Sequence, residues 1–375
     1  MPRNPLAAHP PWRQLLIISV LLPVAIVAAV LAFAWPAARI APRDLPVGIV
    51  GAGPAGGQAV ENLARAQPGG FDFHLYPDAA TASAAIRERI VYGAFIVGPT
   101  EVTVLEASAA SATVAQLLSA VGQHLADHAA QQATSRTGPP IAAQARIVDL
   151  VPASAQDPRG LVLGSALLPL TICGIVAAAA VALLLAFRPA WRQMSALVVV
   201  SVLVGLGAYL VAQPFLGALP GEHLASWGAL GLTLLAVASA TAGLIALVGT
   251  AGLAVGAALM VFVGNPFSGV TSAPELLPGA VDHLGQWLPP GAGANLLRST
   301  AYFHGNGAAG HLAVLIAWSV AGLSAIFVGH HTSIRFAAHP TRYKSTPFAP
   351  AAGQPTAVAS VEHLDSEMTP QPLRA

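Results

Sequence analysis

Long uninterrupted runs of apolar residues dominate the hydrophobic pattern of this chain. No Asp, Glu, Lys or Arg occurs between Gln193 and Gly221, between His223 and Pro274, or between Ser299 and Ile334. A helix crosses the hydrocarbon core of a bilayer with about 20 such residues. These runs and two others predict a polytopic α-helical membrane protein with six transmembrane helices, at 15–35, 161–187, 195–216, 225–249, 251–267 and 310–329.

The first run, 15–35, has a second interpretation, because Ala32-Phe33-Ala34 resembles a signal-peptide cleavage site. The apolar core of a cleaved signal peptide is about 7–15 residues long, and this run is longer. We therefore expect an uncleaved first helix, with Trp35 as an anchor at the interface.

The pattern changes to short apolar groups in 36–160, which contains 8 arginines and 10 acidic residues. Alternating groups predict strands at 46–50, 71–76, 92–98, 102–108 and 145–151. Helical spacing predicts helices at 58–67, 79–90 and 111–132. We expect an α/β domain, inserted between the first two membrane helices and large enough to bury its own core.

Basic residues orient the chain. With six spans, segments 1–14, 188–193 and 330–375 share one side, and each has at least 2 basic residues near a membrane end. Such segments usually face the cytoplasm. We expect both termini in the cytoplasm, the α/β domain outside it, and the protein in the cell membrane. The tail within 330–375 becomes rich in Pro, Ala, Ser and Thr, which predicts disorder.

The α/β segment opens with a glycine pattern, Gly51, Gly53 and Gly56, which follows a predicted strand and precedes a predicted helix. This context is typical of dinucleotide-binding folds, in which an acid about 20 residues on binds the ribose. Asp78 has that spacing, although a helix N-cap is its simpler role. Dinucleotides are cytoplasmic cofactors and the expected domain lies outside, so we expect a plain turn and no cofactor. A membrane-anchored dinucleotide-binding oxidoreductase remains the distant alternative.

Composition agrees with a membrane protein, since 55% of the residues are hydrophobic and 9% are charged. The net charge of +1 gives no reason to expect a nucleic-acid partner. His124, Asp127 and His128 could begin a metal site but lack a further ligand, and no catalytic constellation stands out. We therefore expect no enzyme, no metal and no cofactor.

Two segments resemble a known family. These are "PVGIVGAGPAGG…FDFHLYPDAATASAAIRERIVYGAFIVGP" and "FVGNPFSGVTSAPELLPGAVDHLGQWLPPGAGANLLRSTAYF" (262–303). Together they are similar to membrane proteins of the YhgE/Pip (phage-infection protein) kind, within the type-2 ABC transporter permeases. The resemblance covers roughly 12–330. It implies the permease subunit of an exporter for a hydrophobic or amphipathic substrate, and a homo- or heterodimer.

The segment 269–309 is too polar and Pro-broken to span a membrane, yet too apolar for a free loop. It predicts short helices that re-enter the outer leaflet, because bent backbone at that depth must be covered by protein. Arg298 either reaches lipid headgroups from the interface or takes part in gating. The candidate gate consists of Pro274, Glu275, Pro278, Pro289, Pro290 and Arg298.

The chain contains no phosphate-binding loop of the ATPase type, since its only lysine is Lys344 in "TRYKSTP". A transporter of this kind would therefore need a separate ATP-binding subunit. Arg188, Trp191 and Arg192 are the candidate contacts for it, or else simple determinants of topology. Permeases of this kind have a longer helix there than "RPAWRQ". A non-transporting membrane scaffold that binds partners through its outer domain is thus the alternative.

Small residues at helix-packing spacing, above all Gly252 and Gly256, allow helices to approach closely in lipid. They either pack helices within one subunit or form the seam of a dimer. The lipid bilayer itself is the one partner that the whole hydrophobic pattern predicts.

Overall fold

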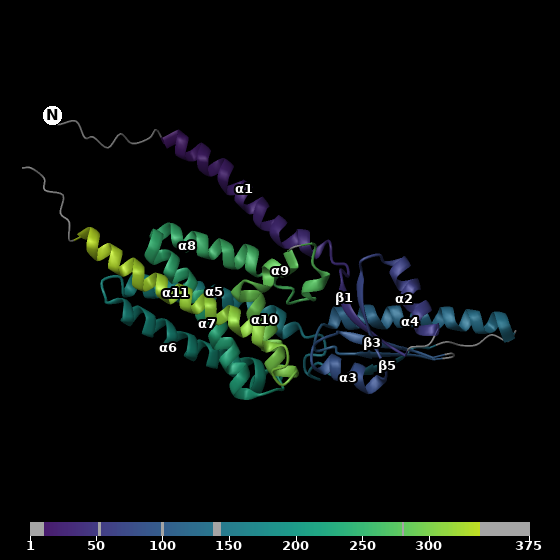
Figure 1. The fold of residues 1–375 in the computed structure, drawn as a ribbon. Coiled ribbons are helices and arrows are strands. Elements are labelled where there is room, and N and C mark those ends of the chain that lie inside the picture. Colours follow the sequence, from purple (N-terminus) through teal and green to yellow (C-terminus); the bar gives the residue numbers. More distant parts are fainter. Residues whose placement is uncertain (1–10, 52–53, 99–100, 138–143, 280, 338–375) are drawn as a thin grey trace, which may run out of the picture. The chain divides into compact units, whose positions relative to one another are not determined.

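The computed structural model describes residues 11–51, 54–98, 101–137, 144–279 and 281–337, and it is mostly helical (Figure 1). Met1–Ile334 form one compact unit. Of the second unit, Arg335–Ala375, only the end of the last helix is described. The predictions for 1–10 and for the tail from 338 onward lie outside the described residues.

Within the described residues, five helices are long and apolar enough to cross a membrane, which indicates a membrane-embedded polytopic protein. They confirm five of the predicted apolar segments as helices. These helices are α1 (Pro11–Ala37), α5 (Leu161–Leu184), α6 (Ala190–Leu210) with its π-helical continuation η1 (Val211–Phe215), α7 (His223–Val248) and α11 (Ala308–Ala337).

The helix expected at 251–267 is shorter than the other five. It consists of α8 (Thr250–Ala257) and the π-helical η2 (Ala258–Gly264), and it ends where Pro266 begins the 3-10 helix η3 (Pro266–Ser268). At 1.5 Å per residue it is about 22 Å long, against a hydrocarbon core of about 30 Å. Gly249, with φ +69°, makes the turn that folds it back on α7.

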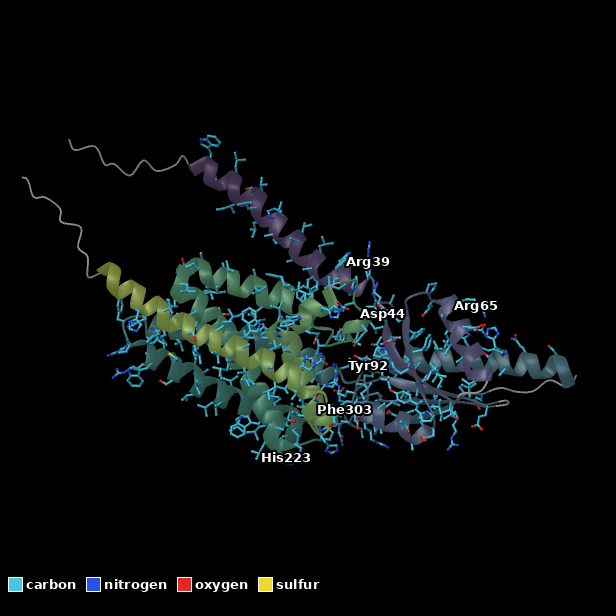
Figure 2. All side chains as sticks on the ribbon, in the orientation of Figure 1. Arg39, Asp44, Arg65, Tyr92, His223 and Phe303 are labelled. Carbon is cyan, nitrogen blue, oxygen red and sulfur yellow. The ribbon has the colours of Figure 1, made fainter. Side chains whose placement is uncertain are left out.

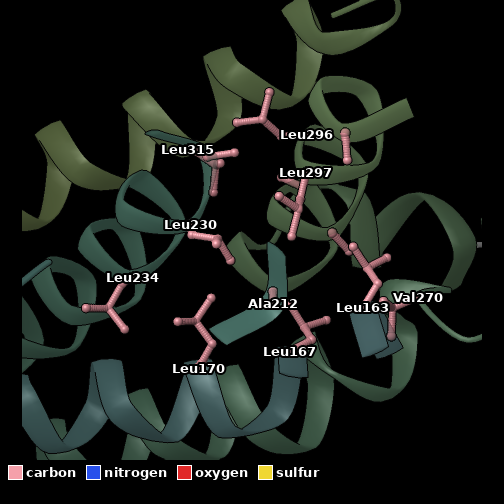
Figure 3. Close-up of a cluster of buried hydrophobic side chains, with 14 of the residues drawn as sticks. Leu163, Leu167, Leu170, Ala212, Leu230, Leu234, Val270, Leu296, Leu297 and Leu315 are labelled. Atoms are coloured by element: carbon pink, nitrogen blue, oxygen red, sulfur yellow. The ribbon is translucent and has the colours of Figure 1, made fainter. Parts of the chain in front are cut away.

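The helices pack around α7, which contacts α5, α6, α8 and α10 (Pro289–Tyr302). Gly205 of α6 lies so close to Gly231 of α7 that an added Cβ would come within 2.6 Å of the Gly231 Cα. The main buried cluster lies between these helices, with Leu167, Leu230 and Leu297 at its centre (Figure 3). By contrast, the apolar window of α1 buries none of its residues within this chain.

Residues 45–149 form the predicted α/β segment. Its strands are β1 (Leu45–Val50), β2 (Phe71–Tyr76), β3 (Gly93–Val97), β4 (Val102–Glu106) and β5 (Arg146–Asp149). Its helices are α2 (Pro54–Ala66), α3 (Ala79–Arg87) and α4 (Ala112–Thr137). The strand order is β2-β1-β3-β4-β5; all neighbours are parallel except the β3–β4 hairpin.

Both faces of this sheet are covered, because β1 is buried along almost its full length. Helix α3 packs on one face with Ala82 and Ile86, and α4 packs on the other with Val114 and Leu118. Asp78 caps α3, since its carboxylate accepts the Thr81 backbone N–H at 2.8 Å. The expected N-cap role of Asp78 is thereby confirmed.

The core of the sheet is not supplied by 36–160 alone, contrary to the expectation from its size. Ala273 and Leu276, from the segment between η2 and α11, belong to the cluster on the α4 face. Phe303 belongs to the cluster on the α3 face. Figure 2 labels Phe303 and Tyr92 where the sheet meets the membrane helices. The segment between η2 and α11 therefore packs against both faces of the sheet.

Candidate functional site

Helix α10 (Pro289–Tyr302) packs against α7 and α5 and carries several buried polar side chains. It follows η4 (Pro274–Leu276) and α9 (Val281–Gln286), so the short helices expected within 269–309 are present. Pro289 and Pro290 begin α10, where the N–H that proline lacks would have no helical partner. Every residue from Pro289 to Ala301 is buried, although Asn295, Arg298 and Ser299 are polar.

Arg298 does not reach the surface of this structure, because only 6% of it is exposed. Its guanidinium donates to the Val270 carbonyl oxygen at 3.0 Å and to Asn295 Oδ1 at 3.3 Å. Both acceptors are neutral. Arg298 therefore does not take the headgroup-facing position that was one of its two expected roles. The reason is that α10 is enclosed by its neighbouring helices.

Arg89, which the sequence did not single out, contacts the same helix from the α/β side. It follows the end of α3 with φ +62°, a conformation that L-residues adopt rarely. Its guanidinium donates to Asn295 Oδ1 at 2.9 Å, to the Asn295 carbonyl at 3.1 Å and to Ser299 Oγ. It also lies over the Phe303 ring, 5.3 Å from the centroid. The unusual backbone of Arg89 thus directs its side chain into α10.

A second contact between the two parts of the chain involves an acidic group. The Tyr92 hydroxyl donates to Glu275 at 2.8 Å. Beside it, the Arg43 N–H donates to the Glu275 carbonyl, and the Arg43 guanidinium donates to the Leu276 carbonyl at 3.0 Å. We call the set Arg89, Tyr92, Glu275, Asn295, Arg298 and Ser299 the junction.

The junction carries two arginines and one carboxylate. Among the described residues, no carboxylate lies within 4.0 Å of Arg89 or Arg298. Burial lowers the pKa of the Arg89 guanidinium, while Tyr92 and Glu275 act in the opposite direction. Burial, and then the negative charge of Glu275, raises the pKa of the Tyr92 phenol, so this hydroxyl stays protonated and donates. The site is therefore cationic and rich in donors.

Two polar cavities adjoin the junction. One, of about 300 Å³, is lined by polar side chains that include Arg89, Tyr92, Glu275, Asn295 and His311. The other, of about 420 Å³, has Arg298, Arg159, Tyr302 and several serines in its wall, beside apolar side chains that include Leu161, Leu163 and Val270. We call the second one the polar cavity, after the charged and hydroxyl side chains in its wall.

An apolar cavity of about 480 Å³ lies beside the polar cavity, between α5, α6 and η1. Leu163 and Ser165 line both. The apolar cavity extends along α5 as far as Cys173. Gly207 of α6 lines it, and a Cβ added to Gly207 would have no atom within 4 Å. Pro214 in the π-helical η1 ends the regular part of α6 beside this cavity.

The remaining candidate gate residues are structural neighbours of the junction. Pro274 begins η4, and the buried Pro278 follows it toward α9. Pro290 packs against Gly264, where a Cβ would lie 2.7 Å from its ring. The structure therefore brings Glu275 and Arg298 to the junction and uses the prolines to begin and end the short helices around it.

Gly252 and Gly256 pack within the subunit. A Cβ on Gly252 would lie 2.2 Å from the Leu244 carbonyl oxygen, and one on Gly256 would lie 3.0 Å from Thr241. Both neighbours belong to α7. The structure thus places these glycines in the close approach of α8 to α7.

Arg188, Trp191 and Arg192 lie together at the α5–α6 connection, at the opposite end of α5 from the polar cavity. All are exposed, Trp191 by 63%, and the Arg192 guanidinium lies 5.3 Å from the centre of the Trp191 ring. The connection itself, residues 185–189, contains no helix.

Of the three glycines at the start of the α/β segment, Gly53 lies outside the described residues. Gly51 has φ +103°, which favours glycine, and Gly56 lies in the first turn of α2. The cavities described above are lined by other residues. Within the described part of the chain, no three His, Cys, Asp or Glu side chains gather as a metal site.

Comparison with known proteins adds no identification. No protein-family model matches the chain, and no curated protein matches it significantly.

Proposed function

We propose that this chain is the membrane subunit of a transporter that moves a hydrophobic or amphipathic molecule, as its resemblance to type-2 ABC permeases implies. The apolar cavity beside α5 and α6 is the observation that carries the proposal. Its volume of about 480 Å³ lies within the range of small-molecule sites. Its lining by Leu163, Pro169 and Val204 suits an apolar substrate.

The proposed arrangement has six crossings, with the α/β segment outside the cytoplasm. The turn at Gly249 separates α7 from α8, and α8 with η2 then leads back to α10. A local thinning of the bilayer accommodates a helix of this length. The apolar surface of α1, which this chain leaves uncovered, then faces lipid or the second subunit of a homo- or heterodimer.

Energy would come from a separate ATP-binding subunit on the cytoplasmic side. Arg188, Trp191 and Arg192 are its proposed contacts, because they are exposed and lie together at the α5–α6 connection. Exposed aromatic and arginine side chains are common anchors of protein interfaces.

Purification of the intact protein from its native membrane tests the proposal. We expect an ATPase to copurify, and we expect Arg188→Ala/Trp191→Ala/Arg192→Ala to lose it. The control is Arg65→Ala/Arg87→Ala, which changes two exposed arginines of the α/β segment. If no ATPase accompanies the wild-type protein, transport driven by ATP is refuted.

The short α5–α6 connection favours a second candidate, a membrane scaffold without transport. Residues 185–189 provide no helix on which an ATPase could act, and the junction fixes the α/β segment on α10 through Arg89 and Tyr92. Copurification of another membrane or extracytoplasmic protein, retained in the triple variant, would support this candidate instead.

A further inference from the structure

Among the described residues no carboxylate pairs directly with Arg298; Glu275, the one carboxylate of the junction, accepts from Tyr92 instead. Its side chain is more than nine-tenths buried and donates only to an amide oxygen and a carbonyl oxygen. Arg89, which donates to the same Asn295 oxygen, is also positive. Buried charges are normally paired, because leaving water costs several kcal/mol per ion. An anion in the polar cavity would supply the missing partner.

The polar cavity has further groups that suit an anion. Arg159 lines it together with Arg298, and Ser111 adds a hydroxyl whose oxygen accepts the Val114 N–H. Two carboxylates lie close by, but both are engaged. Asp157 accepts the Leu161 and Val162 N–H groups at the start of α5, and Asp149 accepts the N–H and hydroxyl of Ser108. The two arginines therefore remain available to a ligand.

The apolar cavity adjoins this cavity. The two share Leu163 and Ser165, and the apolar cavity extends along α5 to Cys173. At 1.5 Å per residue, the stretch from Leu163 to Cys173 is about 15 Å long, half the thickness of a hydrocarbon core. A cavity with charged side chains and an apolar cavity thus adjoin, over a length comparable to one leaflet.

We propose that these two cavities bind a single membrane phospholipid whose headgroup has a net negative charge. Its phosphate pairs with Arg298 and Arg159, and one acyl chain lies between α5 and α6. An anionic phospholipid is then the substrate class of the proposed transporter. Only the movement of the lipid, and not its binding, depends on the proposed function. Binding itself requires no ATPase.

Native mass spectrometry of the intact protein in detergent tests the proposal, with phosphatidylglycerol and phosphatidylcholine of equal chain length as probes. Both lipids carry the phosphate, but only phosphatidylcholine brings a cation beside the two arginines, so we expect the wild type to prefer phosphatidylglycerol about tenfold. Arg298→Gln abolishes the preference. Arg159→Gln, on an exposed residue, reduces it without disturbing the packing of α10, which guards against misfolding as an explanation.

A second pair of variants tests whether an acyl chain binds in the apolar cavity. Gly207→Phe fills the apolar cavity and prevents binding of both lipids. Gly228→Phe is the matched control, because Gly228 is also exposed and open to an added Cβ but does not line the cavity. An unchanged lipid preference in both arginine variants, or unchanged binding in Gly207→Phe, overturns the proposal.

Two results distinguish a lipid site from a site for a free anion and from ATP-driven transport. Inorganic phosphate that raises the melting temperature of the wild type but not of Arg298→Gln, with no lipid bound, points to a free anion and overturns the lipid site. A selective lipid site in a protein that brings no ATPase supports the inference while refuting ATP-driven transport.

Discussion

The Asn295 side-chain oxygen accepts hydrogen bonds from two arginines, Arg89 and Arg298, which lie far apart in the sequence. Arg89 donates to its Oδ1 from the α/β side and Arg298 from the same helix, while its own amide donates to Gln286 Oε1 at 2.6 Å. The Asn295 side chain can satisfy both cations because its oxygen has two lone pairs. This arrangement fixes the orientation of α10 relative to α3 and α9, and its cost is the proximity of two like charges.

Arg89→Lys should loosen α10. A lysine ammonium cannot reproduce the fork of donors that contacts Asn295 and Ser299, so buried acceptors lose partners at about 1–3 kcal/mol. We expect faster amide hydrogen exchange in α10 and a lower melting temperature in detergent. Arg87→Lys, on an exposed residue two positions earlier, is the control and should leave both unchanged. Equal exchange in wild type and Arg89→Lys would show that the contact does not hold the helix.

Glu106 gives a pH-dependent prediction. Burial, and secondarily the charge of Asp149, raises the pKa of this carboxyl, against the lowering effect of the Ser119 hydrogen bond. The folded state therefore binds the proton more tightly than the unfolded state, and this contribution to stability is lost as the pH rises through the folded-state pKa. Glu106→Gln, which still can accept from Ser119, should raise the melting temperature at neutral pH.

The gain in Glu106→Gln should shrink as the pH falls below the ordinary carboxyl range, because the wild-type side chain is then protonated as well. Glu101→Gln, an exposed change on the same hairpin, should show no gain at either pH. A destabilised Glu106→Gln at neutral pH would contradict the assignment.

At this scale the sequence predicted local roles better than distant contacts. The N-cap at Asp78 follows from a Pro-Asp turn before a helical run, so it could be predicted. Arg89 could not, because its function depends on a left-handed backbone and on a helix 206 positions away. Glu275 and Arg298 were found because charges are conspicuous in an apolar segment, while the neutral Asn295 between them gave no signal.

Helices in this molecule approach one another through paired small residues. Gly205 and Gly231 bring α6 and α7 into backbone contact, and Gly243 of α7 meets Gly322 of α11, where an added Cβ would lie 2.7 Å from the Gly322 carbonyl. Such contacts replace the hydrophobic driving force that is weak between helices in lipid.

Gly205→Ala should therefore destabilise the bundle by about 1–3 kcal/mol through overpacking, despite the better helix propensity of alanine. Gly207→Ala, two residues along the same helix with nothing within 4 Å of its Cβ, gains that propensity without a clash and should be neutral or stabilising. Thermal unfolding of both variants in detergent measures the difference. A tolerated Gly205→Ala would mean that α6 and α7 are not in contact at this point.

Most elements could be predicted from periodicity, because long apolar runs and short alternating groups are strong local signals. The exception is informative. The run at 251–267 looked like the other spans, but Asn265 and Pro266 end its helix and π-helical turns replace its last part. Hydropathy averages do not register where a helix stops.

At the scale of the whole molecule, the sheet and the membrane helices share one structural core. Leu276→Ala tests this. The residue follows the fifth apolar segment in sequence but is 1% exposed within the α4 face of the sheet. Its truncation should cost about 2–5 kcal/mol and increase hydrogen exchange in β1 and β4. Leu284→Ala, in α9 and 48% exposed, should leave exchange in the sheet unchanged, whereas equal effects would argue against a shared core.

The number of crossings decides on which side the cavities open. Cys173 is the single cysteine of the chain, so Cys173→Ala gives a background for single-cysteine labelling in intact cells. Gln116 of α4, Ala186 of the α5–α6 connection and Thr250 at the start of α8 are exposed. With six crossings, an impermeant maleimide should label Gln116→Cys in intact cells, and Ala186→Cys and Thr250→Cys only after permeabilisation. If Thr250→Cys is labelled together with Gln116→Cys, α8 and η2 do not cross. If Gln116→Cys is shielded in intact cells, the sheet faces the cytoplasm, and the nucleotide interpretation of its glycine turn returns.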